Sequence, residues 1–141
     1  YFLAMRRLPV VAGVVIGEGA RIFITRRAKG QHLSGFWEFP GGKVEEGETS
    51  FQALHRELQE ELAIVVKKAD LWMQIQHDYS AMSIAMEVFM VTDYEGVPRG
   101  AEGQQGQWVE IGELCAESTE FLFPEANQAI LVKLAALAWL P

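Results

Sequence analysis

Residues 42–64 read GKVEEGETSFQALHRELQEELAI and form the most informative stretch of the sequence. Apolar residues recur through its second half at the three- and four-residue spacing of one helical face. These are Phe51, Leu54, Leu58 and Leu62. We therefore expect a helix over residues 50–63 that packs through this face. Thr49 or Ser50 is the expected N-cap, because a hydroxyl can accept a hydrogen bond from a free N–H of the first turn.

Three carboxylates lie on the same predicted helix. At about 100° per residue, Glu57, Glu60 and Glu61 fall within an arc of roughly 100° beside the apolar face. Like charges this close repel each other, and Mg²⁺ relieves such repulsion by binding proteins through a few carboxylates together with substrate phosphates. The plainer interpretation is a solvated helix face whose charges pair with Arg56 and neighbouring lysines.

The spacing of the fixed residues favours the metal-binding interpretation. Gly42, Glu48 and the run from Arg56 to Ile64 read G-x5-E-x7-R-E-L-x-E-E-x-A-I. This pattern resembles the Nudix box, G-x5-E-x7-R-E-U-x-E-E-x-G-U, in which U is a bulky aliphatic residue. Every position matches except Ala63, which stands where the family has glycine. Because helices often end in a left-handed residue at such a glycine, we expect either strain of roughly 1 kcal/mol or a different helix exit, with no ligand lost.

Further motifs resemble those of MutT-type 8-oxo-dGTP diphosphatases and extend the similarity from about Val10 to Leu137. They are Ile22–Arg27, Glu38–Lys43, Glu102–Trp108 and Phe123–Asn127. The resemblance implies the Nudix fold, an α/β (α+β) architecture in which a mixed β-sheet lies between helices as an α/β/α sandwich.

The remaining patterns are compatible with that fold. β-Branched runs at residues 10–16 and 21–25 flank a glycine-containing turn and predict a hairpin. We expect further strands at residues 70–77, 83–92 and 107–111, loops at 28–35 and 95–106, and a final helix at 124–139 that begins at Pro124. Strands interleaved with two helices predict a sheet covered by helices.

The resemblance implies a divalent-cation site, with Mg²⁺ as the expected ion and Mn²⁺ as an alternative. Its ligands would be Glu57, Glu60, Glu61, Glu102 and the backbone carbonyl of Gly41. The proline and two glycines within residues 39–42 predict a turn at which the backbone approaches an ion or ligand closely. Bound cations of this kind screen phosphates and lower the pKa of a bound water.

Arg56, Glu57 and Glu102 are the expected catalytic residues. Glu102 corresponds to an acid that either binds a cation or takes the proton from the attacking water; the alternative is an ordinary loop charge. Arg56 is expected to pair with Glu48 or Glu60 and so orient the carboxylates. The resemblance implies attack of water at the β-phosphorus, which releases a nucleoside monophosphate and pyrophosphate.

Arg27, His32, Phe39 and Asn127 are the expected substrate-binding residues. The Asn127 amide offers both a donor and an acceptor, so it can read a purine edge, or alternatively cap the last helix. Phe39 would contribute backbone groups to the base pocket, and Arg27 and His32 would reach the nucleotide. A solvated loop position is the alternative for His32.

The resemblance implies a pyrophosphohydrolase that converts 8-oxo-dGTP to 8-oxo-dGMP and so prevents mutation. MutT-type enzymes are expected to have a basic residue near residues 80–84, where this sequence has Ala81, Met82 and Ser83. Another nucleotide, such as CTP or a modified dCTP, is therefore an alternative substrate. A non-catalytic nucleotide sensor on the same fold is a third possibility.

Composition sets further bounds. The 141 residues predict one domain over 1–141, with residues 1–7 as a flexible N-terminal extension and Met5 as the natural start. A net charge of −7 argues against binding a nucleic-acid polymer, which requires lysine and arginine contacts. The single cysteine, Cys115, predicts a reduced, cytoplasmic setting. No apolar run reaches the length of about 18 residues that a transmembrane helix needs. We expect a monomer or weak homodimer that binds a free nucleotide.

Overall fold

Strand β1 lies at the centre of a seven-stranded mixed sheet in the computed structural model, which describes residues 6–31 and 33–137. The strand order along the main path is β3-β2-β1-β6-β5, while β4 pairs with β1 and β7 pairs with β2. The pairing of β1 with β6 is parallel, and the other pairings are antiparallel. The strands are β1 (Leu8–Gly17), β2 (Arg21–Arg26), β3 (Trp37–Glu38), β4 (Gly41–Lys43), β5 (Val65–Asp78), β6 (Ser83–Glu95) and β7 (Gly106–Glu110). The helices are α1 (Ser50–Leu62), α2 (Ile111–Leu114), the 3₁₀ turn η1 (Glu125–Asn127) and α3 (Gln128–Leu137).

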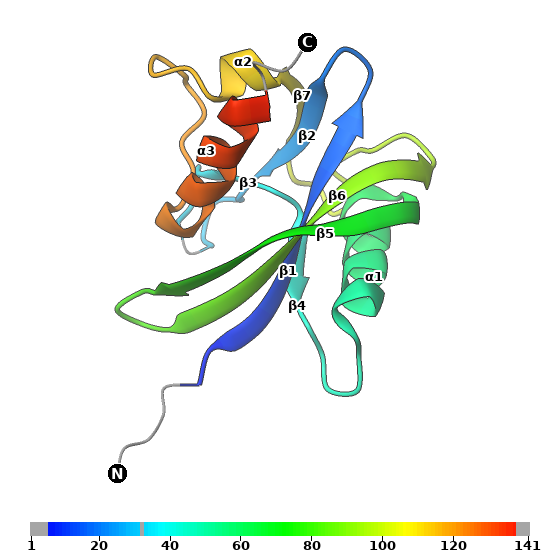
Figure 1. Ribbon diagram of the computed structural model, residues 1–141, viewed down its shortest axis with the longest axis vertical. Helices are drawn as coiled ribbons and strands as arrows, with labels where there is room; N and C mark the ends of the chain where they lie inside the picture. The colour runs from blue at the N-terminus through cyan, green and yellow to red at the C-terminus, as the bar shows by residue number, and fades with distance from the viewer. Residues whose placement is uncertain (1–5, 32, 138–141) are drawn as a thin grey trace.

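Alternating side chains of β1 serve two separate cores. Val11 and Val15 face a cluster that includes the leucines of α1, whereas Ala12 and Val14 face the cluster that includes α3. Figure 1 shows α1 on one side of the sheet and α3 on the other. The predicted α/β/α sandwich with a mixed sheet is therefore confirmed.

Helix α1 begins and ends with well-defined caps. Thr49 is the N-cap and forms a capping box with Gln52, so its hydroxyl accepts from the Gln52 N–H at 3.1 Å. Ala63 ends the helix in the left-handed conformation, with φ 59° and ψ 37°. The strained left-handed position expected at the missing box glycine is therefore present, and its N–H donates to the Gln59 carbonyl at 3.1 Å.

The apolar face of α1 is confirmed for three of its four predicted residues. Leu54, Leu58 and Leu62 are fully buried. Phe51 is 42% exposed, so its prediction as a core residue is wrong. It lies in the first turn of α1, and helical periodicity gives the direction of a side chain without showing whether the sheet reaches far enough to cover it.

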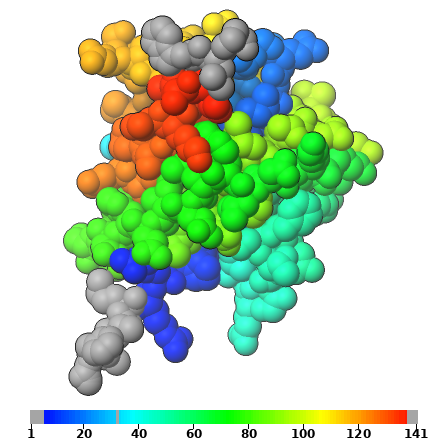
Figure 2. Space-filling model, in the orientation of Figure 1, coloured from blue at the N-terminus to red at the C-terminus, as the bar shows by residue number. Residues whose placement is uncertain are grey.

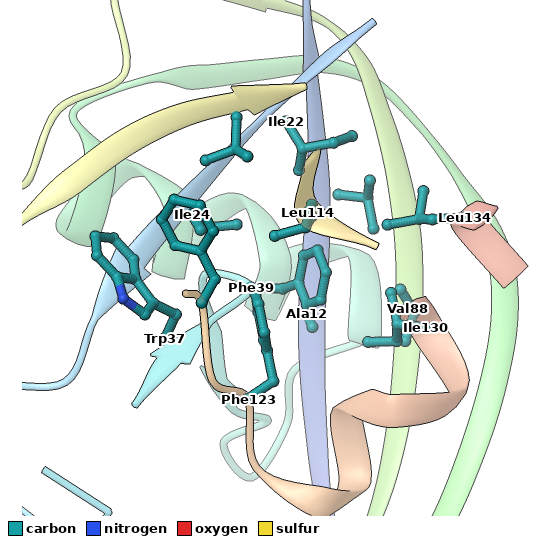
Figure 3. Packing of buried hydrophobic residues seen from close by; sticks show 13 residues of the cluster. Ala12, Ile22, Ile24, Trp37, Phe39, Val88, Leu114, Phe123, Ile130 and Leu134 are labelled. Carbon is teal, nitrogen blue, oxygen red and sulfur yellow. The ribbon is translucent and has the colours of Figure 1, made fainter. Parts of the chain in front are cut away.

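Aromatic side chains fill much of the core on the α3 side of the sheet, called here the second core (Figure 3). Phe39 and Phe123 stack with ring centroids 5.1 Å apart, and Trp37 meets Phe121 edge-on at 5.2 Å. Helix α3 covers this core and packs beside β5 (Figure 2). The Lys133 ammonium in α3 donates to the Trp72 carbonyl in β5 at 2.8 Å. This packing fixes the segment after Phe123 against the sheet.

Several predicted boundaries were wrong. The Gly41–Lys43 segment is a short strand paired with β1 where a turn was expected, and Gly41 fits there because a β-carbon would overlap the Val11 carbonyl. The expected helix from Pro124 is a 3₁₀ turn followed by α3, and residues 138 and 139 of that prediction lie outside the described residues. Strand β3 and helix α2 were not predicted, since two to four residues carry no periodicity.

Candidate active site

Helix geometry buries the three glutamates of α1 to different depths. At about 100° per residue, Glu61 stands roughly 20° from the buried Leu54 around the helix axis. Glu57 stands roughly 60° and Glu60 roughly 120° from the same leucine. Glu61 is accordingly partly buried, the Glu57 side chain is 19% exposed and the Glu60 side chain is 51% exposed. The expected trio is therefore two inward carboxylates and one that faces solvent.

Arg56 holds the neighbouring acids in place. Its guanidinium donates to both carboxylate oxygens of Glu48, at 2.7 and 2.9 Å, and to Glu57 at 2.7 Å. The contact with Glu60 is longer, at 3.5 Å. Hydrogen bonds from Arg56 are the main cause that lowers the pKa of Glu48 to about 2. The expected pairing of Arg56 is thus present with both partners and is tighter with Glu48.

The Glu61 carboxylate faces the β4 backbone and several other acids. It accepts a hydrogen bond from the Gly41 N–H at 2.9 Å. Burial is the main cause that raises the pKa of Glu61 to about 9, and the negative charges of Glu38, Glu57 and Glu102 add to the rise. Burial also raises the pKa of Glu57, against the opposing hydrogen bond from its arginine partner. A cation placed here would relieve repulsion among these carboxylates.

A cavity of about 220 Å³, called here the acidic cavity, opens beside these groups. It lies between α1, β2 and the loop that precedes β7. Its lining residues are Thr25, Arg26, Arg27, Ala28, Gln31, Glu38, Gly41, Glu61, Glu102, Gly103 and Gln104. Glu102, which is distant from α1 in the sequence, thus shares a cavity with Glu61, as the resemblance implied.

The donor set of the acidic cavity fits a hard divalent cation. Carboxylate and main-chain oxygens are the ligands that Mg²⁺ prefers. The Glu57 carboxylate also lies directly over Gly42, where a β-carbon would overlap it, so the backbone and this acid are closely packed. Within residues 6–31 and 33–137, no three acidic, histidine or cysteine side chains are already arranged as a cation cage. The ligand roles of Glu57, Glu60, Glu61, Glu102 and Gly41 therefore stay predictions.

A second cavity of about 500 Å³, called here the apolar cavity, adjoins the first. Its lining is largely apolar and includes the turn between β5 and β6. The residues are Arg27, Leu33, Glu38, Tyr79, Ser80, Ala81, Met82, Ile84, Met86, Pro124, Ala126 and Asn127. Asn127 is only 6% exposed. Its main-chain N–H donates to the Pro124 carbonyl at 2.9 Å, whereas its side-chain amide makes no hydrogen bond with another described residue. The Asn127 side chain makes no cap hydrogen bond with a described residue and lines this cavity, which favours contact with a ligand there over the helix-cap alternative.

Arg27 and Glu38 join the two cavities, since both residues line each of them. The Arg27 guanidinium donates to the Glu38 carboxylate at 3.1 and 3.3 Å. Burial raises the pKa of Glu38 despite this positive neighbour. Sequence reasoning gave Glu38 no role, although it is the first residue of the Glu38–Lys43 motif.

Of the other predicted substrate-binding residues, Phe39 lines neither cavity. Phe39 is buried in the second core, and its ring stacks on Phe123 outside both cavity linings. His32 lies outside the described residues. Met82 is 45% exposed and lines the apolar cavity where a basic residue was expected, so this wall carries no charge at that position.

Comparison with known proteins assigns the fold to a family. The sequence model of the family described as "NUDIX domain" matches residues 11–133 of this chain. The chain belongs to the Nudix family. Nudix hydrolases in general need a divalent metal ion, which agrees with the oxygen donors gathered in the acidic cavity. No helix in the described part of the chain has the length and hydrophobicity needed to span a bilayer.

Individual relatives cover between 74% and 94% of this chain. An 8-oxo-dGTP diphosphatase from Escherichia coli (strain K12) is 39% identical over 133 residues, covering 94% of this chain and 100% of the relative. A CTP pyrophosphohydrolase from the same organism is 35% identical over 104 residues, covering 74% and 76%. A MutT structure, from work on the Aliivibrio salmonicida and Vibrio cholerae proteins, is 40% identical with a TM-score of 0.78 and covers 94% of this chain and 98% of that chain.

Proposed function

We propose that this Nudix protein is a Mg²⁺-dependent nucleoside triphosphate pyrophosphohydrolase that prefers 8-oxo-dGTP and so removes a mutagenic precursor from the nucleotide pool. The observation that carries the proposal is the junction of the acidic and apolar cavities at Arg27 and Glu38. A nucleotide has the same two parts, a charged phosphate chain that a cation neutralises and a flat base that apolar walls can bury. The similarity to the E. coli 8-oxo-dGTP diphosphatase supports this substrate.

Glu57, Glu61 and Glu102 would hold the cation, with Glu60 and the Gly41 carbonyl as further ligands. When bound, Mg²⁺ would neutralise phosphate charge and lower the pKa of an attacking water. Arg56 keeps Glu57 against the β4 backbone through the 2.7 Å hydrogen bond and is therefore a positioning residue. Mn²⁺ has the same charge and also accepts oxygen ligands, so it is expected to substitute.

The chain's own groups account for the proton and the phosphates. Glu102 accepts the proton of a water whose oxygen bonds to the β-phosphorus. The bond from this phosphorus to the α–β bridging oxygen breaks, and that oxygen leaves with the nucleoside monophosphate. Arg27 lies where the two cavities join and offsets negative charge on the phosphate chain. The products are a nucleoside monophosphate and pyrophosphate.

Asn127 provides the discrimination between oxidised and normal guanine. Oxidation at C8 converts N7 from an acceptor to a donor, and the Asn127 side-chain oxygen can accept from it. In dGTP the same oxygen would face another acceptor, which costs roughly 1–3 kcal/mol for an unmade buried hydrogen bond. The apolar walls formed by Met82, Ile84 and Met86 would hold the plane of either base.

CTP is the second candidate substrate. Met82 leaves the β5–β6 wall without a positive charge, and a relative named CTP pyrophosphohydrolase matches most of the chain. A smaller pyrimidine would fill less of a cavity of about 500 Å³, which favours a purine. We expect the protein to act in the cytoplasm, as a monomer or weak homodimer, on free nucleotides.

A substrate panel tests the proposed function. Initial rates for 8-oxo-dGTP, dGTP, CTP and dCTP are measured with Mg²⁺, with Mn²⁺ and with a chelator. The proposal predicts the highest kcat/KM for 8-oxo-dGTP, with pyrophosphate rather than orthophosphate as the product and no turnover in chelator. Equal or faster hydrolysis of CTP would replace the substrate assignment with the second candidate.

A further inference from the structure

The loop before β7 folds back over the C-terminal end of α1. The Ala101 N–H donates to the Glu61 carbonyl at 2.9 Å, and the Arg99 N–H donates to the Leu62 carbonyl at 3.1 Å. The last carbonyls of a helix have no partner within it, so these bonds satisfy two of them. They also attach the loop that carries Glu102 to the turn of α1 that carries Glu61.

Gln104 strengthens this attachment through its side chain. The side-chain oxygen accepts from the Glu102 N–H at 2.8 Å, and the side-chain nitrogen donates to the Glu61 carbonyl at 3.0 Å. The amide therefore bridges the main chains of two acids that share the acidic cavity. An amide has a donor and an acceptor on one side chain, whereas a carboxylate has acceptors alone and alanine has neither.

The surrounding backbone leaves this bridge little freedom. The Gly103 N–H donates to the Gly100 carbonyl at 3.2 Å, which closes a tight turn around Glu102. Gly103 has a φ of +86°, and a β-carbon at Gly100 would overlap the Gln104 carbonyl oxygen. Gln104 also lines the acidic cavity beside Glu61 and Glu102. Gln104 belongs to the Glu102–Trp108 motif, which by itself predicts no role for this residue.

We infer that Gln104 is a positioning residue that holds Glu102 beside the α1 carboxylates, an inference that rests on the proposed function. It acts through the Glu102 main chain, to which its side-chain oxygen is hydrogen-bonded. A merely structural role, in which the amide only stabilises the end of α1, is the competing explanation. The two differ in whether the effect on turnover passes through the Glu102 carboxylate.

A double-mutant cycle on kcat separates these explanations. The variants are Gln104→Ala, Glu102→Gln and the double variant, with Gln105→Ala as the matched control because Gln105 is exposed and its side chain makes no hydrogen bond with a described residue. We expect Gln104→Ala to lower kcat roughly tenfold or more through misplacement of Glu102, with Gln105→Ala within about twofold of wild type. In the Glu102→Gln background, Gln104→Ala should cause no further loss. Equal fractional losses in both backgrounds would overturn the inference.

Amide hydrogen exchange gives a readout that needs neither metal nor activity. The Glu102 N–H should exchange roughly tenfold faster or more in Gln104→Ala than in wild type, because its partner is removed. The Ala101 N–H, whose partner is a main-chain oxygen, should change less and serves as the internal reference. Unchanged Glu102 exchange would refute the positioning role. If the wild-type protein hydrolyses no nucleotide, the proposed function fails, while this exchange measurement still decides whether Gln104 holds the Glu102 main chain.

Discussion

At the scale of single residues, the site depends on carboxylates that the fold places close together at a cost. Glu61 combines partial burial with three acidic neighbours, and Glu57 is held in place by Arg56. Such an arrangement is unfavourable for the protein alone, and under the proposed function a bound cation would offset the repulsion. The consequences are measurable both in stability and in turnover.

Glu61 should make the metal-free protein less stable as the pH rises. Its pKa is raised from 4.5 to about 9, so between these values the folded chain keeps a proton that the unfolded chain has released. Stability therefore falls with increasing pH across this range. In the Glu61→Gln variant the replacing side chain is uncharged at every pH. We therefore expect the Tm of this variant to exceed that of wild type by at least about 3 °C near pH 8.

This Tm difference should shrink towards acidic pH, where wild-type Glu61 is protonated in both states. Thermal unfolding in the presence of a chelator at several pH values measures it. Glu60→Gln removes one charge from the same helix at an exposed position and controls for the change in net charge. A Tm difference that is equally large near pH 4 would contradict the assignment.

Glu57 should be essential for turnover. We expect Glu57→Gln to lower kcat at least about 100-fold, because the variant loses a charged oxygen ligand next to the phosphates. Circular dichroism and thermal unfolding should show that the fold survives. Glu46→Gln, an exposed acid in the loop before α1, is the matched control and should retain near-wild-type kcat. Comparable turnover in both variants would refute the role of Glu57.

Asn127 should determine selectivity for the oxidised base. Asn127→Ala removes the amide that lines the apolar cavity, so the Kd for 8-oxo-dGMP should rise about tenfold or more. The Kd for dGMP should change much less and is the internal control. Isothermal titration calorimetry with both nucleotides measures the ratio. A parallel loss for both would show that Asn127 shapes the cavity without reading the base.

At the scale of elements, α1 links stability to the site. Its leucines fix the helix on the sheet, Thr49 caps its start, and the strained Ala63 ends it where the Glu102 loop attaches. The left-handed Ala63 is the one position at which this chain departs from the box pattern. Its cost belongs to folding and not to the chemistry.

Ala63→Gly should therefore stabilise the protein. Relief of left-handed strain exceeds the extra entropy that glycine gives the unfolded chain, for a net gain of about 0.5–1 kcal/mol. Chemical denaturation gives the free energy of unfolding. Ala53→Gly is the matched control, because Ala53 lies in the helix interior with ordinary helical geometry and should be destabilised by at least about 1 kcal/mol. Destabilisation of Ala63→Gly would contradict the strain at this position.

At the scale of the whole molecule, local patterns predicted more of the fold than of the site. Period-two runs and the leucine face of α1 were sufficient for the main strands and for the helix on one side of the sheet. The predicted burial of Phe51 was wrong because its exposure depends on how far the sheet extends, and helical periodicity carries no information about that. The Gly41–Lys43 strand was not predicted because its pairing with β1 is a long-range contact, which local patterns do not reveal.

The site shows the same division. The positions of Glu57 and Glu61 on one helix follow from helical spacing. Glu102 shares the acidic cavity with Glu61 only through the fold of a loop about 40 residues away in sequence, and spacing alone carries no such information. The resemblance to a family supplied that residue. Glu38 and Gln104 were visible as parts of motifs, but their positions between the cavities and between two acids appear only in three dimensions.

The central claim is that α1 gathers its acids to bind a divalent cation against a phosphate chain. A crystal structure with Mn²⁺ and a non-hydrolysable nucleoside triphosphate, with the anomalous signal of manganese recorded, tests it most directly. We predict anomalous density between Glu57, Glu61 and the phosphates, with the base beside Asn127. A bound nucleotide with no manganese among these carboxylates would contradict the account.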